Sequence, residues 1–449
     1  MSEPYDVVGV GIGPFNLGLA ALLDGVEGVD PLFLEQEGSF GWHEGMLIDG
    51  ATLEVPFLAD LVTMADPTSP HSYLNYLKEQ GRLYEFYFYE TFQIPREEYD
   101  AYCTWAAERL GSCRFGRRVT RVADDGDAFL VEARDPETGD EKRYRARNVV
   151  SGIGSRPHVP EGLRGHSDED IFHSARYMDR RGRCLDAEGI TVVGSGQSAA
   201  EIFLDLLDAQ PEGDYRLDWL TRSEGFFPME YSKLGLQHFT PEYVDYFYDL
   251  PRGTKADLLD EQDLLYKGID PGTSEEIYDL LYERSIGSSP EVGMLANSEV
   301  RGIDALEDGR YRLRCEQREE GTRFDHESEV VVLATGYRRP FPDFLAPIED
   351  RIETTGGRLD VRRDYRLEGE GLPGEVFVQN AEVHTHGVGA PDLGLGCHRN
   401  AVIANAVCDR EVYPVGEDTV FQDFSVEQFA NHAPARVLDE PRAPLTRED

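Results

Sequence analysis

Two stretches of the sequence decide the fold: Tyr5–Leu23, YDVVGVGIGPFNLGLAALL, and Ile190–Leu207, ITVVGSGQSAAEIFLDLL. Each contains an apolar run, a glycine-rich turn and then small and apolar residues at helical spacing. This order is typical of a buried parallel strand that continues into a helix. Because it occurs twice, the sequence predicts an α/β protein with two Rossmann-like dinucleotide-binding domains.

The first turn, Gly11-Ile12-Gly13-Pro14-Phe15-Asn16, follows the dinucleotide-binding pattern except that Asn16 replaces the third glycine. The pattern needs Gly11 for a tight turn and Gly13 for a close approach of the backbone to a pyrophosphate, which the helix N-terminus stabilises. Glu35 ends the next predicted strand, where a carboxylate accepts hydrogen bonds from ribose hydroxyls. We expect a dinucleotide here.

The second turn, Gly194-Ser195-Gly196-Gln197-Ser198-Ala199, is followed by a strand over 216–221 that ends at Arg222. A guanidinium at this place suits a 2′-phosphate, which favours NADPH over NADH; the alternative is a solvated surface arginine. Two dinucleotide sites in one chain indicate electron transfer between two bound nucleotides. The economical interpretation is FAD at the first turn and NADPH at the second.

Two further strand ends indicate where the chain passes between the domains: the glycine-containing stretches 151–154 and 334–337, the second of which includes Thr335 and Gly336. We predict an FAD-binding domain over 1–165 and 330–430. An NADPH-binding domain over 170–330 is inserted in it and carries a helical segment, 226–300, on the substrate side. The tail 431–449 is expected to be weakly ordered.

The charge balance limits the partners. The 449 residues include 86 acidic and 44 basic side chains, a formal net charge of −42 spread along the chain. Such a field repels nucleic-acid backbones and anionic membrane surfaces. It indicates a strongly hydrated surface suited to the salt-rich cytosol of an extreme halophile, the alternative being an acidic patch for a cationic partner.

The sequence indicates neither export nor a dithiol redox centre. The N-terminus has no basic region, and no apolar stretch is long enough to span a membrane, so we expect a cytoplasmic protein. The six cysteines form no CxxC, which predicts reduced thiols and no zinc site. The missing CxxC also excludes the disulfide reductases and leaves dithiol-free reductases and monooxygenases.

Several stretches resemble the L-lysine N6-/L-ornithine N5-monooxygenases, the flavin-dependent amine N-hydroxylases of hydroxamate siderophore synthesis. The resemblance runs from about residue 5 to 410. It is carried by GxGPxNLxLAxL at 11–22, FGWHxGM at 40–46, FLxDLVTxxDPTSPxSxLNYL at 57–77, YxxYxxWAAE at 99–108, VVGSGQSAAEIF at 192–203, FTPEYVxxF at 239–247, ATGYR at 334–338 and THGV at 385–388.

The resemblance implies that NADPH reduces FAD, that O2 adds to give a C4a-hydroperoxyflavin protected by the retained NADP⁺, and that a neutral primary amine becomes a hydroxylamine. It implies no catalytic side chain beyond the flavin, no metal, and a homodimer or homotetramer. Carried over residue by residue, the cofactor contacts are Gly11, Gly13, Pro14, Asn16, Glu35, Trp42 and His43 for FAD, and Gly194, Gly196, Gln197, Ser198 and Arg222 for NADPH, with Thr335 and Gly336 at the return.

The departures from the family pattern concern the substrate. The family usually reads QxxFLKDL, in which the lysine holds the α-carboxylate of the amino acid. Here Glu54 replaces the glutamine and Ala59 the lysine, and Leu236 and Gln237 stand where ornithine enzymes have an asparagine. A pocket that has lost a cation and gained a carboxylate should favour a diamine (1,3-diaminopropane, putrescine or cadaverine) over lysine or ornithine. Alternatively, Lys233 or a nearby arginine supplies the missing charge.

Other side chains allow two interpretations. His43 contacts the flavin or is a structural histidine, and Asp60 either orients its loop or acts as a base. Trp42 should pack near the isoalloxazine. His384 and His386 lack a third metal ligand and are expected in a loop that closes the site. Two rival functions remain: an NADPH–flavin monooxygenase of ketones or sulfides, although its FxGxxxHxxxW fingerprint is absent, and a non-catalytic flavin redox sensor.

Overall fold

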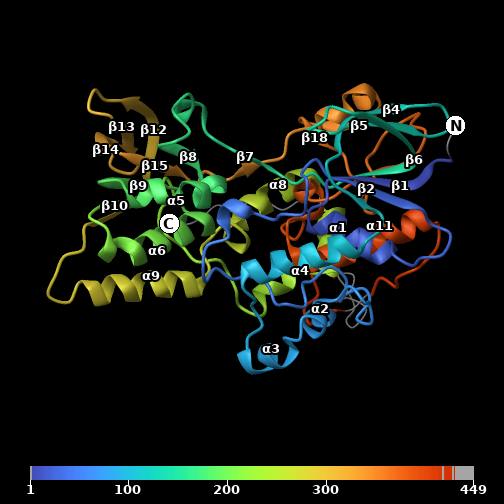
Figure 1. Cartoon of the computed structure of the whole chain (residues 1–449), viewed down its shortest axis with the longest axis horizontal. Helices are drawn as coiled ribbons and strands as arrows, with labels where there is room; N and C mark the ends of the chain where they lie inside the picture. The colour runs from blue at the N-terminus through green and yellow to red at the C-terminus, as the bar shows by residue number, and fades with distance from the viewer. Residues whose placement is uncertain (1–2, 417–418, 427–428, 430–449) are drawn as a thin grey trace.

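The computed structural model describes residues 3–416, 419–426 and 429, and Figure 1 shows two α/β lobes. The chain builds most of the first lobe and leaves it through β7 (Arg156–Pro157). It then builds the second lobe and returns through β16 (Tyr337–Arg338), which pairs antiparallel with β7. The second nucleotide-binding domain is therefore inserted in the first, and the predicted fold class is confirmed.

The first lobe contains a seven-stranded sheet in the order β3-β2-β1-β6-β5-β4, with β19 also paired to β6. β1 pairs in parallel with β2 and β6, whereas β4 and β5 extend the sheet antiparallel. Val7 and Val8 of β1 are fully buried on opposite faces, as expected for a central strand covered on both sides. The strands are β1 (Tyr5–Val10), β2 (Pro31–Leu34), β3 (Cys113–Arg114), β4 (Arg118–Asp124), β5 (Phe129–Arg134), β6 (Glu141–Ser151) and β19 (Val376–Val378).

Three helices lie next to this sheet: α1 (Pro14–Leu23), α4 (Arg96–Arg109) and α11 (Leu393–Cys408). α1 and α11 are close because Gly18 has no side chain: a Cβ there would lie 2.7 Å from the Asn400 amide. α2 (Tyr73–Glu79) and α3 (Leu83–Tyr89) form the part of the lobe farthest from its sheet (Figure 1). The first glycine turn thus lies between the sheet and two closely packed helices.

The second lobe contains a five-stranded parallel sheet in the order β11-β10-β9-β15-β8. Helices α5, α6 and α9 cover one face, and the antiparallel sheet β12-β13-β14 covers the other. The elements are β8 (Ile171–His173), α5 (Tyr177–Leu185), β9 (Gly189–Val193), α6 (Gln197–Ala209), β10 (Arg216–Leu220), α9 (Pro271–Arg284), β11 (Val292–Leu295), β12 (Ser298–Ala305), β13 (Tyr311–Gln317), β14 (Thr322–Ser328) and β15 (Val330–Leu333). Helices α7 (Pro241–Asp249) and α8 (Arg252–Glu261) belong to the same stretch of sequence but contact α10 (Val383–His386) of the first lobe, and Arg363 pairs with Asp245 and Asp249 of α7.

Short elements complete the described chain. They are the 3-10 helices η1 (Glu44–Met46), η2 (Glu161–Leu163), η3 (Ser174–Arg176), η4 (Gln210–Glu212), η5 (Gly235–His238), η6 (Asp263–Leu265) and η7 (Asp343–Arg351), the helix α10 (Val383–His386), and the strands β17 (Thr354–Thr355) and β18 (Arg358–Leu359).

Two boundaries differ from the prediction. β15 pairs with β8 and β9, so the chain returns to the first lobe after Leu333 and not at residue 330. The segment 226–300, predicted to be helical, is helical only in part: no helix lies over 226–234, η5, α7, α8, η6 and α9 follow, α9 stops at Arg284, and β11 then pairs in parallel with β10. Periodicity does not separate a four-residue apolar strand from a helical turn. The predicted tail 431–449 lies outside the described residues.

Within the described ranges, no helix has the length and apolar character needed to cross a bilayer. All six cysteines are free thiols, and five of them are buried.

Candidate active site

The first glycine turn has the geometry that a bound pyrophosphate requires. Gly11 has a φ of +86°, and a Cβ there would lie 2.8 Å from the carbonyl oxygen of Gly152. Gly13 immediately precedes α1, and a Cβ there would meet nothing within 4 Å. A phosphate can therefore approach the backbone N–H groups of the helix N-terminus, and the turn fits a dinucleotide.

Glu35 and Asn16 hold this turn from two sides. Glu35 accepts a hydrogen bond of 2.8 Å from the Ile12 N–H, which places its carboxylate beside the turn. Asn16 is fully buried; its amide nitrogen donates to the Gly11 carbonyl (2.8 Å), and its amide oxygen accepts from Gln379 (2.7 Å). The departure from the glycine pattern thus has a structural reason, because Asn16 ties the turn to the end of β19. A direct contact between Asn16 and FAD stays a prediction.

The loop with Trp42 and His43 lies where the two lobes meet. The Trp42 ring packs edge-on against Tyr99, with 5.0 Å between centroids, and the backbone N–H of Trp42 donates to the Asp100 carboxylate (2.7 Å). Desolvation by the surrounding protein, with the charge of Arg96, lowers the pKa of His43 to about 4, so the ring is neutral at pH 7. His43 has a φ of 54°, a left-handed conformation that non-glycine residues rarely adopt. The contacts of Trp42 with Tyr99 and Asp100 thus tie the loop to α4.

The second glycine turn repeats the arrangement of the first. Gly194 has a φ of +149°, a Cβ there would lie 2.3 Å from the Ala334 carbonyl oxygen, and the Trp219 indole N–H donates to the Gly194 carbonyl (2.7 Å). Gly196 precedes α6, whose first residues are Gln197 and Ser198. The turn fits a second dinucleotide for the same reasons as the first.

Arg222 follows β10, with its side chain exposed, at the edge of the second turn. Arg318, which was not predicted, lies in the β13–β14 turn and donates to the Arg222 carbonyl (3.3 Å). The hydroxyls of Ser195 and Ser223 are 2.9 Å apart in the same region. In the part of the chain that the structure describes, neither arginine has a carboxylate partner, so both guanidinium groups are free for a phosphate.

Replacing Arg222 by alanine is expected to raise the KM for NADPH about tenfold and to leave the KM for NADH unchanged, because only NADPH carries a 2′-phosphate. Arg323→Ala, which removes a side chain that is 84% exposed on β14, is the matched control. Steady-state NAD(P)H oxidation measures both constants. A parallel loss with both cofactors would show that Arg222 does not read the phosphate.

Thr335 and Gly336 join the two connections between the lobes. The Thr335 hydroxyl donates to the His158 carbonyl (2.6 Å), and the Gly336 carbonyl accepts from the His158 N–H (2.8 Å) and from the His173 ring (2.9 Å). Their observed contacts support the crossover. Their predicted contact with a cofactor stays a prediction.

Glu54 lies between the lobes, is partly buried and has no ion-pair partner among the residues that the structure describes. Its carboxylate accepts from the Gln197 amide (3.1 Å), and its carbonyl accepts from the Tyr231 hydroxyl (2.7 Å). Burial raises the pKa of Glu54 to about 9; the hydrogen bond to Asp270 and its charge add to the shift, and so does the charge of Glu201. Arg96 opposes the shift too weakly to cancel it. Glu54 is therefore protonated at neutral pH unless a cation comes close.

Ala59 lies beside a second acid, Asp392, which was not predicted. The Asp392 Oδ1 and the Ala59 Cβ are 2.9 and 3.9 Å from the position that a Cβ of Gly394 would take. Asp392 caps α11, and burial raises its pKa to about 6. Burial and then the charges of Glu54, Asp392 and Asp270 raise the pKa of Tyr231, so this tyrosine stands among three carboxyl groups. None of the three has an ion pair among the described residues.

Leu236 and Gln237 are on η5, and the hydrogen bonds of Gln237 are not with Glu54 or Ala59, the other two predicted substrate residues. The Gln237 amide oxygen accepts from the backbone N–H groups of Phe421 (3.2 Å) and Gln422 (3.1 Å), and Leu236 is 37% exposed. Lys233, the alternative source of positive charge, is exposed and has no ion pair in the described ranges. The substrate roles of Leu236 and Gln237 stay predictions, and no hydrogen bond of the described residues joins η5 to Glu54 or Ala59.

A buried ion pair joins the lobes next to Glu54. Arg96 of α4 and Glu201 of α6 form a two-pronged pair (2.6 and 2.9 Å), with side chains only 11% and 7% exposed. Arg96 also donates to the carbonyls of Met46 (3.0 Å) and Thr52 (3.4 Å). This pair fixes α6, and hence the second turn, against the loop that carries Glu54.

Replacing Arg96 by alanine is expected to lower the free energy of unfolding by about 3–5 kcal/mol, because Glu201 is left buried without its partner. The control Arg252→Ala breaks a pair with Asp360 in which the arginine is 67% exposed, and should cost less than about 1 kcal/mol. Denaturant unfolding in molar KCl measures both. Equal losses in the two variants would contradict the assigned role of Arg96.

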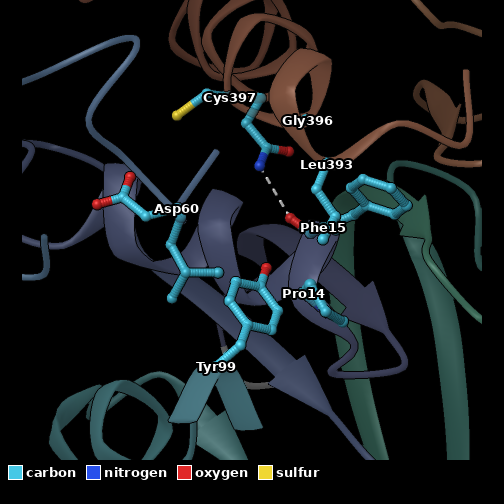
Figure 2. Close-up of a pocket in the computed structure, with 9 residues that line it drawn as sticks. Pro14, Phe15, Asp60, Tyr99, Leu393, Gly396 and Cys397 are labelled. Atoms are coloured by element: carbon cyan, nitrogen blue, oxygen red, sulfur yellow. Dashed lines mark hydrogen bonds between the residues drawn. The ribbon is translucent and has the colours of Figure 1, made fainter. Parts of the chain in front are cut away.

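Asp60 orients its loop. Its two carboxylate oxygens accept four hydrogen bonds, from the N–H groups of Val62 (3.0 Å), Thr63 (2.6 Å) and Tyr73 (2.8 Å) and from the Thr63 hydroxyl (2.6 Å). Figure 2 shows the small cavity beside it, where Tyr99 reaches toward Pro14 and Phe15 at the start of α1. At about 10 Å³ this cavity is the size of one water molecule, so the packing behind the first turn is tight. The contacts favour orientation over the alternative of a catalytic base.

His384 and His386 make structural contacts. His384 donates to the Leu359 carbonyl (2.7 Å), and the buried His386 ring stacks on Tyr365 at 4.5 Å. Among the described residues, no three His, Cys, Asp or Glu side chains are placed to hold a metal ion. Closure of the site by this segment stays a prediction.

The comparisons with known proteins agree with this geometry. The family described as L-lysine 6-monooxygenase/L-ornithine 5-monooxygenase matches residues 3–339. The rhizobactin siderophore biosynthesis protein RhbE of Rhizobium meliloti is 46% identical over 94% of this chain and 95% of its own length. The putrescine N-hydroxylase of Shewanella oneidensis is 43% identical over 98% and 86%.

A solved structure is also similar. It is that of DfoA bound to FAD, the cadaverine monooxygenase of desferrioxamine biosynthesis from Erwinia amylovora, with a TM-score of 0.91 and 42% identity over 94% of this chain and 99% of that one. The resemblance that was recognised in the sequence is thereby confirmed, and the ketone or sulfide monooxygenase and the redox sensor are set aside. The chain belongs to the L-lysine 6-monooxygenase/L-ornithine 5-monooxygenase family of N-hydroxylating flavoenzymes.

Proposed function

We propose that this protein hydroxylates one amino group of a short diamine in siderophore biosynthesis, with FAD and NADPH as cofactors. The observation that carries the proposal is the charge around position 59. The place of the family's carboxylate-binding lysine is taken by Ala59, and the partly buried carboxyl of Asp392 and the Ala59 side chain both lie within 4 Å of the Cβ position of Gly394. The named activities of two relatives, a putrescine N-hydroxylase and a cadaverine monooxygenase, are both reactions of diamines and support the same substrate class.

The overall reaction is the conversion of R–NH2, O2, NADPH and H⁺ to R–NHOH, NADP⁺ and water. Bound FAD, reduced by NADPH, supplies the oxygen activation. The chain's own part is binding and positioning. Gly11 and Gly13 admit the FAD pyrophosphate with Glu35 at its ribose, and Gly194 and Gly196 admit that of NADPH with Arg222 and Arg318 at its 2′-phosphate.

A diamine has one end to be oxidised and one ammonium to be held. The space around Tyr231 offers the carboxyls of Glu54, Asp270 and Asp392 and no base paired with them among the described residues. An ammonium in this space compensates the charge of Asp392 and favours ionisation of Glu54. The α-carboxylate of lysine or ornithine would instead face carboxyl groups, which repel it.

The test is an amine panel in molar KCl, with NADPH oxidation, hydroxylamine and released peroxide measured together. Putrescine, cadaverine and 1,3-diaminopropane are expected to give hydroxylamine in proportion to the NADPH consumed, and lysine and ornithine mostly peroxide. Butylamine, which lacks the second ammonium, is the control and should bind weakly. Tight coupling with lysine or ornithine and not with diamines would overturn the diamine assignment and leave the family membership intact.

The net charge supports a particular cellular environment. The net charge of −42 supports a place in the cytoplasm of a salt-rich cell, without nucleic acid or a membrane surface as partner. KCl screens the repulsion among the acidic side chains. We expect activity and the unfolding temperature to rise together as KCl is raised to molar concentration; maximal stability in dilute buffer would contradict this setting.

A further inference from the structure

The chain that follows α11 returns toward η5 and α7. α11 ends at Cys408, and the Tyr413 hydroxyl donates to the Leu22 carbonyl at the end of α1. Asp392 caps the opposite end of α11, sixteen residues or about 24 Å of helix away. Residues 419–424, which we call the C-terminal strap, contact η5 and α7. The chain thus passes from the end of α1 to the substrate-side segment that was predicted from the sequence.

Hydrogen bonds fix the strap to both elements. The Gln237 amide oxygen on η5 accepts from the backbone N–H groups of Phe421 (3.2 Å) and Gln422 (3.1 Å). The Glu242 carboxylate on α7 accepts from the backbone N–H of Thr419 and from its hydroxyl (2.6 Å). Gln237 is therefore used to hold another part of the chain, a role that does not involve the amine.

One ring of the strap enters an aromatic cluster. Phe424 packs against His238 (5.3 Å between centroids), Tyr243 (4.9 Å) and Tyr246 (6.0 Å), and Tyr243 is buried. Phe421, three residues earlier in the same strap, is 99% exposed. The strap is therefore anchored by the ring of Phe424 and not by that of Phe421.

A small apolar core joins the strap to the turn that precedes Asp392. In this core the fully buried Phe247 of α7 packs with Val388, and Phe424 packs against the same cluster. The next residue, Gly389, accepts a hydrogen bond at its carbonyl from the Asp392 N–H (3.0 Å). The position of Asp392 therefore depends on α7, and α7 is held in turn by the strap.

We propose that the C-terminal strap holds η5 and α7 against the turn before Asp392 and so keeps the amine pocket in shape and closed to water, with Gln237 and Phe424 as positioning residues. The proposal rests on the proposed placement of the amine beside Ala59 and Asp392. When water enters such a pocket, NADPH, O2 and H⁺ give NADP⁺ and H2O2 without hydroxylamine. Among the described residues, no hydrogen bond or ring contact joins the strap to a glycine turn, so cofactor binding should not depend on it.

The first test compares two phenylalanines of the strap in the full-length holoenzyme in molar KCl. Phe424→Ala is expected to raise the KM for the amine about tenfold and the peroxide released per NADPH about twofold or more. Its flavin content and KM for NADPH should stay at the wild-type values. Phe421→Ala, which removes an exposed ring and keeps the backbone N–H that Gln237 accepts, is the matched control and should behave like the wild type.

A double-mutant cycle separates the strap from direct binding of the amine. Gln237→Leu removes the acceptor for two strap N–H groups. If Gln237 acts through the strap, the KM of Gln237→Leu/Phe424→Ala should exceed that of the weaker-binding single variant by no more than about twofold, because both changes release the same segment. If Gln237 instead bound the amine, the two effects would multiply.

Hydrogen exchange gives a measurement that needs no turnover. The amides of 235–249 should exchange faster in Phe424→Ala than in Phe421→Ala, and amine binding to the wild type should slow the exchange of the same amides. Wild-type KM and coupling in Phe424→Ala, equal effects of the two phenylalanine variants, multiplying effects in the cycle, or unchanged exchange at 235–249 would each overturn the proposal. The kinetics use whichever amine the wild type couples best, so a preference for lysine or ornithine would refute the diamine assignment and still leave the strap tested.

Discussion

Replacing Gly13 by valine is expected to lower FAD affinity at least about a hundredfold and to abolish hydroxylation. The space in front of Gly13 is empty to 4 Å, and it is the space through which a pyrophosphate reaches the N-terminus of α1. A valine side chain would fill that space without touching the rest of the protein. The fold should therefore persist while the cofactor is excluded.

The measurement is the flavin content of the purified variant, followed by a fluorescence titration of the apoprotein with FAD. Gly111→Val is the matched control, because Gly111, like Gly13, has nothing within 4 Å of its Cβ position, but is exposed and lies outside the glycine turns. The control should bind FAD like the wild type. If Gly13→Val retained full flavin, the first turn would not be the pyrophosphate site.

The double variant Glu54→Gln/Ala59→Lys is expected to lose at least about thirtyfold in kcat/KM for putrescine, most of it through KM, and to gain affinity for ornithine. Placing an ammonium beside Asp392 satisfies that carboxyl internally and repels the second ammonium of a diamine. Truncating or opposing one partner of a buried charge pair costs about 2–5 kcal/mol. The new lysine also restores a partner for an α-carboxylate.

The control is Leu58→Lys, which adds the same ammonium one residue away on a side chain that is 37% exposed. Calorimetry in buffers of different ionisation enthalpy adds a test of Glu54 itself. Its pKa of about 9 must fall when an ammonium binds, so near pH 7.5 the wild type should release more protons than Glu54→Gln on binding putrescine. Unchanged putrescine kinetics in the double variant, or equal proton release, would remove Glu54 and Ala59 from the substrate pocket.

The two glycine turns could be predicted because their determinants are local in the chain. Gly11, Gly13, Gly194 and Gly196 lie within a few residues of the strands and helices that they connect, and Glu35 closes the very next strand. The turn conformations follow from the absence of a Cβ, as the positive φ angles of Gly11 and Gly194 show. Asn16, where the sequence departs from the glycine pattern, also has a structural role, since its side chain ties the first turn to Gln379.

The charged surroundings of the substrate could not be predicted in full, because they depend on contacts between distant segments. Asp392 meets Ala59 only when α11 folds back against α1, and Arg318 reaches Arg222 only through the β13–β14 turn. The one local signal for Asp392 was its position as a helix N-cap shortly after the THGV stretch. An aspartate at that position is expected to cap the helix, and the position alone does not indicate that it binds a substrate. Local pattern predicts the glycine turns, whereas packing between distant segments brings Asp392 and Arg318 to their places.

The most direct test of the account is a competition in one vessel. The holoenzyme, NADPH and O2 in molar KCl receive equal concentrations of 1,3-diaminopropane, putrescine, cadaverine, ornithine and lysine, and mass spectrometry follows the hydroxylamines at low conversion. The product ratios then equal the ratios of kcat/KM. One or more diamines are expected to supply nearly all of the product, at least about thirtyfold ahead of either amino acid. Hydroxylated lysine or ornithine as the main product would contradict the diamine assignment.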